Sequence, residues 1–234
     1  MYSSRSPKMR RQSLSLTVII IRKKMAPEIH YNAVEHLAAD SAADPYLRPA
    51  FSRKERWKRA TWNACWLLLY RISPRPMHAW RSMLLRVFGA KMGPNCHFYP
   101  GSRVWAPWNL NCADQVTAAD GAEIYNPAPI ELGSHVVLSQ SAFLCGATHD
   151  FDSPSFPLVA YSMKVGAYAW ICARASVGPG VNVGEGAVLG LGSVASRDLE
   201  PWGVYAGAPA VKIKQRKRAD EARSLEDDKQ TFAG

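Results

Sequence analysis

The chain lacks several features that would place it in a broad class at once. Its 234 residues contain no apolar run of 18 residues and no pair of cysteines spaced as CxxC. Because a membrane-spanning helix needs about 20 consecutive apolar residues, we expect a soluble protein. The cysteines are five, an odd number, and we interpret them as free thiols in a reducing cytoplasm.

Acidic residues are absent from residues 1–24, which contain seven Lys or Arg. These seven account for most of the net charge of +10 and leave only +3 for residues 25–234, so we expect no nucleic-acid partner. The stretch also has no small-residue cleavage site, which disfavours a signal peptide. We interpret residues 1–49 as a disordered leader, with Met25 as an alternative start.

What the chain does contain is a six-residue repeat between Val165 and Val194. Each unit opens with an aliphatic residue, continues with a small one, and has a second small or aliphatic residue in fifth place. The opening residues are Val165, Ile171, Val177, Val183 and Leu189. With 3.6 residues per turn, a helix would scatter these residues around its surface. The repeat therefore predicts a solenoid of triangular coils, with three six-residue faces and the aliphatic side chains inside.

The repeat extends toward the N-terminus in weaker form. Leu132, Leu138 and Leu144 keep its phase, and we expect a degenerate continuation that opens its units at Met92, Phe98, Val104, Leu110 and Val116. The register breaks at residues 126–130 and again at the 15-residue segment 150–164, which we interpret as a protruding loop. We therefore expect a mainly β fold with a solenoid domain over residues 92–215 and a charged tail over 216–234.

Residues 50–91 follow a different pattern. A helix is predicted from Ser52 to Tyr70, and a second one from Met77 to Phe88, closed by Gly89. The segment has ten Lys or Arg against one acid, and it is rich in Trp and Leu. It is interpreted either as a cap over the open end of the solenoid or as a docking segment for an anionic membrane. The two interpretations are compatible.

Several motifs carry a family resemblance. WAPWNL at 105–110, YNPAPIELG, LSQSAFLCGATHD, VGPGVNVGEGAVLGLGSV and EPWGVYAGAPA closely resemble the hexapeptide-repeat acetyltransferases of the colanic acid biosynthesis type. Their relatives are galactoside, maltose and nodulation-factor O-acetyltransferases. The resemblance implies a left-handed parallel β-helix that assembles as a homotrimer, with acetyl-CoA bound between subunits.

It also implies O-acetylation of a saccharide, nucleotide- or lipid-linked, in exopolysaccharide biosynthesis. The expected location is the cytoplasm, with peripheral contact to the inner membrane through residues 50–91.

Acetyl transfer to a hydroxyl needs a base, because an alcohol is a poor nucleophile until its proton is removed. Imidazole, with an unperturbed pKa of about 6.5, suits this role. Of the six histidines, His149 stands directly before segment 150–164. Considered alone it reads as a surface histidine, but its THD motif matches the catalytic element of the family and implies a general base. The role of Asp150 is open. Asn126 matches a family position near the acceptor, and its alternative role is that of a turn residue before Pro127.

The resemblance also implies the residues that contact the cofactor. The matching positions are Trp170, Ala173, Leu191, Ser196, Arg197, Trp202 and Lys212. Backbone groups of Ala173 and Leu191 would bond the pantetheine amides, and Arg197 would meet a phosphate. One departure is that Ala208 and Val211 replace the Asn and Lys of the family's AGNPAK, so contacts by those side chains are absent or are replaced by Lys212.

Two other classes compete with the acetyltransferase. A carbonic anhydrase of the γ type needs three zinc-binding histidines, usually with a HxxxxH pair, and this spacing does not occur in the chain. A non-catalytic solenoid scaffold would not need His149 beside a long insertion. We expect no metal site.

Overall fold

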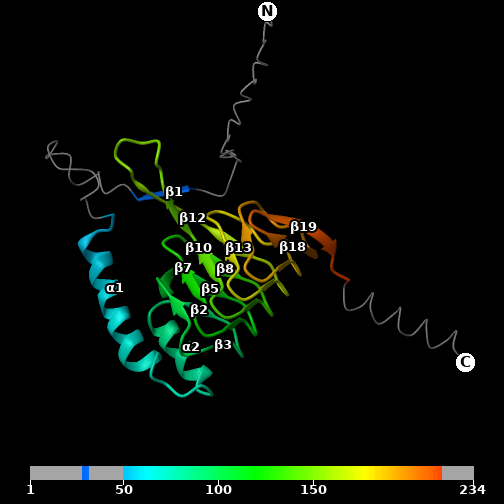
Figure 1. The fold of residues 1–234 in the computed structure, drawn as a ribbon. Coiled ribbons are helices and arrows are strands. Elements are labelled where there is room, and N and C mark those ends of the chain that lie inside the picture. Colours follow the sequence, from blue (N-terminus) through cyan, green and yellow to red (C-terminus); the bar gives the residue numbers. More distant parts are fainter. Residues whose placement is uncertain (1–27, 32–49, 218–234) are drawn as a thin grey trace, which may run out of the picture.

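The hexapeptide repeat folds into a solenoid whose coils stack in parallel (Figure 1). The structure is a computed structural model that describes residues 28–31 and 50–217. The chain passes in turn over three faces of a triangular prism, which we name by their number of strands. Because the chain visits these faces in a fixed order, each strand pairs with the strand of the next coil.

The four-strand face contains β2 (Lys91–Met92), β5 (Leu110–Cys112), β8 (Ile130–Leu132) and β13 (Met163–Val165). The seven-strand face contains β3 (His97–Phe98), β6 (Thr117–Ala118), β9 (Val137–Leu138), β14 (Trp170–Ile171), β16 (Val188–Leu189), β18 (Gly203–Gly207) and β19 (Ala210–Gln215). The five-strand face contains β4 (Arg103–Val104), β7 (Glu123–Tyr125), β10 (Phe143–Cys145), β15 (Ser176–Val177) and β17 (Val194–Ala195). All pairings within the faces are parallel except the terminal hairpin β18–β19.

The aliphatic residues that open the repeat units point into the prism, as predicted. Val165, Ile171, Val177, Val183 and Leu189 are each at most 3% exposed. Leu132, Leu138 and Leu144 continue the same buried column. Each coil thus adds three or more buried aliphatic side chains, and this burial is the main source of stability in a solenoid. The predicted left-handed winding stays a prediction.

The predicted register holds from Met92 to Val104 and is wrong after that point. Met92 pairs with Cys112 and Cys112 with Leu132, so the first two coils span 20 residues each. The extra residues of the first coil form a 3-10 turn at Pro107–Asn109.

Leu110 and Val116 are buried, but neither opens a unit, because Cys112 does so. A fixed period could not anticipate an insertion of two residues.

The segment predicted as a loop forms a hairpin. Strand β11 (Ala147–His149) pairs antiparallel with β12 (Leu158–Tyr161), and β1 (Glu28–Tyr31) adds a third strand on the other side of β12. Residues 28–31 therefore correct the prediction of a disordered leader at that point. The remainder of the predicted leader, apart from Ala50 and the strand, lies outside the described residues, as does the predicted tail after residue 217.

The helical segment agrees closely with its sequence signals. Helix α1 (Arg53–Cys65) begins after Ser52, whose Oγ accepts a hydrogen bond of 3.2 Å from the Glu55 backbone N–H. It continues as a π-helical turn at Trp66–Tyr70, and α2 (His78–Val87) follows the turn at residues 73–76. The chain leaves α2 through Gly89, whose φ of 97° favours glycine. No helix of the described part of the chain is long and apolar enough to cross a bilayer.

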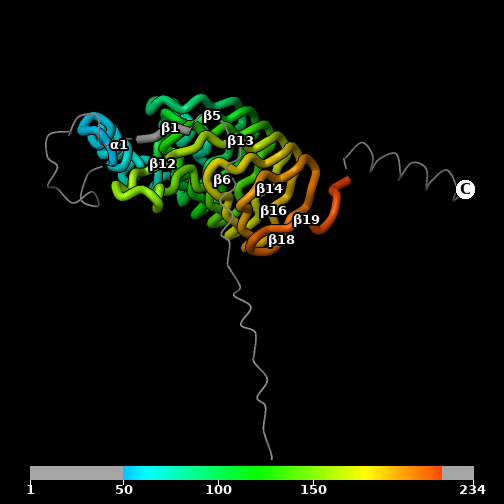
Figure 2. Tube along the Cα trace, turned by 90° about the horizontal axis from the view of Figure 1, so that it is seen from above, coloured from blue at the N-terminus to red at the C-terminus, as the bar shows by residue number. Residues whose placement is uncertain are grey.

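One face of the helical segment belongs to the solenoid core. Trp62 is 1% exposed, and its Nε1 donates to the Val104 carbonyl at 2.7 Å. Trp66 Nε1 donates to the Ser102 carbonyl at 3.0 Å, and the Tyr70 hydroxyl bonds Ser102 Oγ at 2.7 Å. The segment lies at one end of the solenoid and the β18–β19 hairpin at the other (Figure 2). These contacts are those of a cap.

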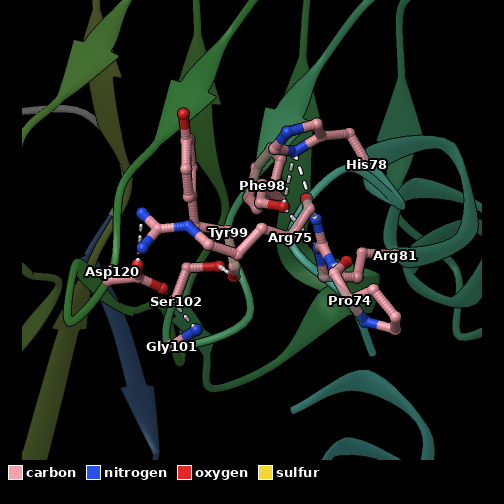
Figure 3. A network of polar contacts seen from close by, with 9 residues as sticks. All are labelled: Pro74, Arg75, His78, Arg81, Phe98, Tyr99, Gly101, Ser102 and Asp120. Atoms are coloured by element: carbon pink, nitrogen blue, oxygen red, sulfur yellow. Dashed lines mark hydrogen bonds and ion pairs between the residues drawn. The ribbon is translucent and has the colours of Figure 1, made fainter. Parts of the chain in front are cut away.

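A buried arginine fastens this cap to the first coil (Figure 3). Arg81 of α2 is 0% exposed and donates to four neutral acceptors. Its Nε bonds the Phe98 carbonyl of β3, and its two terminal nitrogens bond Ser73 Oγ and the carbonyls of Pro74 and Arg75. One side chain thereby joins the turn between the helices to the solenoid. Because Arg81 is buried and has no carboxylate partner among the described residues, its removal would leave these acceptors unpaired, which is costly.

We predict that Arg81→Met lowers the free energy of unfolding by about 3 kcal/mol or more, because the buried Phe98 carbonyl and Ser73 hydroxyl lose their donor. The matched control is Arg86→Met on the same helix. Arg86 is exposed and donates to the Met92 and Gly93 carbonyls at 3.1 and 3.0 Å, where water can replace it. The control should lose less than about 1 kcal/mol in the same urea titration. Equal losses in the two variants would show that burial of Arg81 is not what matters.

Candidate active site

His149 ends strand β11, where the chain leaves the solenoid for the hairpin. The hairpin is held by a small apolar cluster of its own, formed by Ala128, Ala147, Leu158 and Ala160. Phe51, two residues before α1, packs against this cluster. His149 therefore stands on a strand that is fixed by ladder hydrogen bonds on one side and by apolar packing on the other. This is firmer support than the long loop expected from the sequence would have supplied.

The His149 ring is oriented by a single residue of the hairpin, Phe156. The two rings are stacked with their centroids 4.4 Å apart and an angle of 11° between their planes. His149 Nδ1 also lies 2.9 Å from the Phe156 carbonyl oxygen. A carbonyl oxygen can only accept, so this hydrogen bond requires the proton on Nδ1. The half-buried imidazole therefore keeps the lone pair of Nε2 free to accept a proton.

The neighbouring Asp150 closes the turn of the hairpin. Its backbone N–H donates to the Pro157 carbonyl at 3.0 Å, and its Oδ1 accepts from the Asp152 N–H at 3.2 Å. Asp commonly forms such a turn, in which its side chain accepts a hydrogen bond from the backbone N–H two residues later. The role left open by the sequence is thus at least partly structural. Cys145, at the end of the preceding strand, is a poor nucleophile because burial raises the pKa of its thiol.

Asn126 lies inside the protein. Its side chain is 0% exposed, with Oδ1 accepting from the Ala106 N–H at 2.9 Å and Nδ2 donating to the Ala106 carbonyl at 2.8 Å. The amide thus forms two hydrogen bonds with one residue of the previous coil, as a further strand residue would. These contacts agree with the alternative interpretation, in which Asn126 shapes the turn before Pro127. The role near the acceptor that the family resemblance implies stays a prediction.

Three predicted cofactor residues lie near one another at the corner between the seven-strand and five-strand faces. Ala173 follows β14 and Leu191 follows β16, in equivalent places of successive coils, and the Gly192 N–H donates to the Ala173 carbonyl at 3.0 Å. Leu191 is 75% exposed and Trp170 is 45% exposed. Together they offer an open apolar edge along the solenoid, which fits an extended pantetheine chain.

The other predicted cofactor residues lie elsewhere. Ser196 and Arg197 are exposed and follow β17 at the corner between the five-strand and four-strand faces. The His149 hairpin emerges from the same corner two coils earlier, after β10. Trp202 occupies the third corner, where its ring covers Gly186: a Cβ built on that glycine would lie 2.5 Å from the ring. Lys212 on β19 forms an ion pair of 2.7 Å with Glu200. This pairing raises the pKa of Lys212 and lowers that of Glu200.

A single chain therefore does not gather the predicted residues around one cavity. They are distributed over three corners of the prism. A hollow of about 840 Å³ lies on the four-strand face and is lined by residues such as Glu131, Lys164, Asn182 and Asp198. None of the predicted site residues lines it. No three His, Cys, Asp or Glu side chains within residues 28–31 and 50–217 are placed to hold a metal ion.

Sequence reasoning missed the contacts that Phe156 makes with His149. Its side chain stacks on His149 and its carbonyl sets the tautomer. The only available signal was its place in the insertion after His149, between Ser155 and Pro157. A backbone carbonyl leaves no trace in the sequence, so its contact could not have been found there.

Known proteins resemble this chain in sequence and in structure. No family model matches it. The colanic acid biosynthesis acetyltransferase WcaF of Escherichia coli is 35% identical over 155 residues, which cover 66% of this chain and 85% of WcaF. A hexapeptide-repeat acetyltransferase of Vibrio cholerae, solved with acetyl-CoA, superposes with a TM-score of 0.64 at 20% identity over 73% of this chain and 93% of that one. A maltose O-acetyltransferase of Clostridium difficile gives a TM-score of 0.64 at 22% identity over 71% and 90% of the two chains.

We predict that Asn126→Ala lowers the stability of the protein, because the Ala106 N–H and carbonyl lose a buried partner. The expected loss is about 2 to 4 kcal/mol in the free energy of unfolding, seen as a lower melting temperature. Asn109→Ala is the control, since Asn109 is only half-buried and uses Nδ2 alone, toward the Asn126 and Pro127 carbonyls. Loss of activity with an unchanged melting temperature would instead assign Asn126 to the chemistry.

Proposed function

The chain belongs to the hexapeptide-repeat acetyltransferase family, and on that premise we propose that it transfers an acetyl group from acetyl-CoA to a saccharide hydroxyl. The observation that carries the proposal is the hydrogen bond from His149 Nδ1 to the Phe156 carbonyl. This bond leaves Nε2 as a proton acceptor on a rigid strand. Both a nucleotide-linked and a lipid-linked saccharide fit this chemistry, and the likeness to WcaF supports a role in exopolysaccharide biosynthesis.

His149 acts twice in this proposal. Its Nε2 first accepts the proton of the acceptor hydroxyl as the oxygen attacks the thioester carbonyl. A carbon–oxygen bond forms, the carbon–sulfur bond breaks, and the imidazolium then returns the proton to the departing sulfur. The Phe156 carbonyl stabilises the transient positive charge on the ring, because it accepts from Nδ1 throughout.

The open edge formed by Trp170, Ala173 and Leu191 would hold the pantetheine arm of acetyl-CoA. Since Ala173 already uses its carbonyl with Gly192, its N–H is the group that remains for a pantetheine amide. Ser196 and Arg197 belong to a different corner, so they would contact the cofactor bound to a neighbouring chain. Lys212 would contact a phosphate only if it gave up its ion pair with Glu200.

This distribution of residues supports a homotrimer. Flat faces of a prism are self-complementary about a three-fold axis, and such an arrangement brings one corner of each chain against a different corner of its neighbour. A corner with His149 and a corner with Leu191 can then border the same groove. The complete site would exist only in the oligomer.

We predict that His149→Ala lowers kcat for acetyl transfer by ~10² to 10⁴, the usual contribution of a positioned general base. Acetyl-CoA affinity and the melting temperature should change little, since the His149 side chain is not part of the aliphatic core. His135→Ala is the control: this ring also stacks on an aromatic residue, Tyr168, but at another corner. Near-normal turnover of His149→Ala with a verified acceptor would falsify the assignment of the base.

The shared site makes a prediction about mixed oligomers. Leu191→Glu should impair acetyl-CoA binding, since its carboxylate would repel the phosphates of the cofactor and its exposed position tolerates the change. Co-expression of equal amounts of His149→Ala and Leu191→Glu should restore activity, to roughly one quarter of the wild-type value if the subunits mix at random. Each variant assembled alone should stay impaired. Mixed oligomers without recovered activity, or an active monomer in sedimentation analysis, would place each site within one chain.

A further inference from the structure

The helical cap has a second face that the solenoid does not use. Trp57, Leu67, Leu68 and Ile72 are 73%, 52%, 61% and 74% exposed. Helical spacing places Trp57, Leu67 and Leu68 on the side of the segment opposite Trp62 and Tyr70, and Ile72 follows in the turn after the helix. We call these four residues the apolar stripe. Large apolar side chains gathered in this way on a water-facing helix are typical of an interaction surface.

Basic residues border the apolar stripe, and they differ in what they contact. Lys58 and Arg59 are engaged with the solenoid, since Lys58 Nζ lies 4.0 Å from the Trp108 ring centroid and the Arg59 guanidinium 4.1 Å from that of Trp105. Arg53, Lys54 and Arg56 are exposed on the first turns of α1. Two of these, Arg53 and Arg56, line a hollow of about 500 Å³ together with Trp57 and Ala60. The outer surface of α1 therefore combines free positive charge with interfacial aromatic and aliphatic groups.

We propose that this surface docks on an anionic lipid bilayer. Leu and Trp side chains enter the boundary between headgroups and acyl chains, where Trp is favoured. Arg53, Lys54 and Arg56 then lie against the negative headgroups, each adding to the attraction. Charge complementarity selects this occupant, because a purely apolar partner would leave the three cations without compensation. The proposal that this surface docks on a bilayer does not rest on the proposed acetyl transfer.

Docking would also bring the active site to the lipid surface. Phe51 lies two residues before α1 and packs against the cluster that holds the β11–β12 hairpin. The tip of this hairpin extends past the N-terminal end of α1 (Figure 1). A docked helix would hold His149 near the membrane, which suits a lipid-linked saccharide. This consequence, unlike the docking, rests on the proposed function.

The test is cosedimentation of the full chain with vesicles made of equal parts phosphatidylglycerol and phosphatidylcholine. Leu68→Ser with Ile72→Ser should weaken binding about tenfold or more, because two exposed side chains no longer transfer into the interface. The matched control is Val211→Ser with Ile213→Ser on β19, two side chains that are 61% and 59% exposed at the opposite end of the solenoid. This control should bind like the unaltered chain.

A second variant tests the charges independently. Replacing Arg53, Lys54 and Arg56 by Ser should weaken binding roughly 100-fold, at about a factor of five per charge. Vesicles of phosphatidylcholine alone, or high salt, should weaken binding of the unaltered chain in the same direction. Equal binding by the stripe variant and its β19 control would overturn the proposal, as would a lack of binding by the unaltered chain.

Two further readouts separate the alternatives. If the stripe variant changes the sedimentation coefficient without lipid, the surface is an interface between copies of this chain and the proposal is wrong. Acetyl transfer to a saccharide in solution should be the same for all these variants, because none of the altered residues belongs to the proposed site. Loss of vesicle binding with full activity in solution therefore concerns docking alone, whereas loss of activity in His149→Ala concerns the chemistry alone.

Discussion

The structure depends on closing each coil at corners tight enough to keep three flat faces in contact with one aliphatic core. At the corner between the four-strand and seven-strand faces, one residue in each coil has a positive φ. These residues are Asn95, Gln115, His135, Tyr168, Gly186 and Trp202, with φ between 55° and 64°. Only one of them is glycine, although a side chain in this region costs roughly 1 kcal/mol. Hydrogen bonds between successive coils offset that cost, for example from the Tyr168 N–H to the Ser134 carbonyl at 2.8 Å.

The three corners differ in how far they tolerate insertions, and this difference positions the active site. The two corners that flank the seven-strand face keep a constant spacing in every coil that the structure describes. The third corner absorbs the 3-10 turn at Pro107–Asn109, the turn at Asn126, and the hairpin that carries His149. The coil with the hairpin spans 33 residues from Leu132 to Val165, against 18 for the next coil. The strand that carries His149 can emerge there without any disturbance of the aliphatic column.

Sequence patterns predicted what local physics determines. The aliphatic column, the start of the first helix at Ser52 and the helix end at Gly89 follow from spacing and from backbone preferences of single residues, and they were confirmed. The register around Cys112 was not predictable. Leu110 and Val116 are also apolar and buried, and their residue types do not show whether they open a unit or occupy another inward position. The strand at residues 28–31 was missed because its partner, β12, lies far away in the sequence. Likewise, the buried contacts of Asn126 arise between coils, where no local pattern records them.

The helical segment shows how one element can serve two surfaces without conflict. Its inner face needs directional contacts, and Trp62, Trp66 and Tyr70 each use a polar atom to bond the first coil. Its outer face has no such requirement, yet it is more apolar than solubility favours. A cap alone would be stabilised by polar residues at Leu68 and Ile72, because exposing them gains nothing for the fold. Their retention is explained if the surface is buried during function. The same reasoning applies to the residues proposed to contact the cofactor, whose exposure in one chain would be explained by burial against the next chain of the proposed trimer.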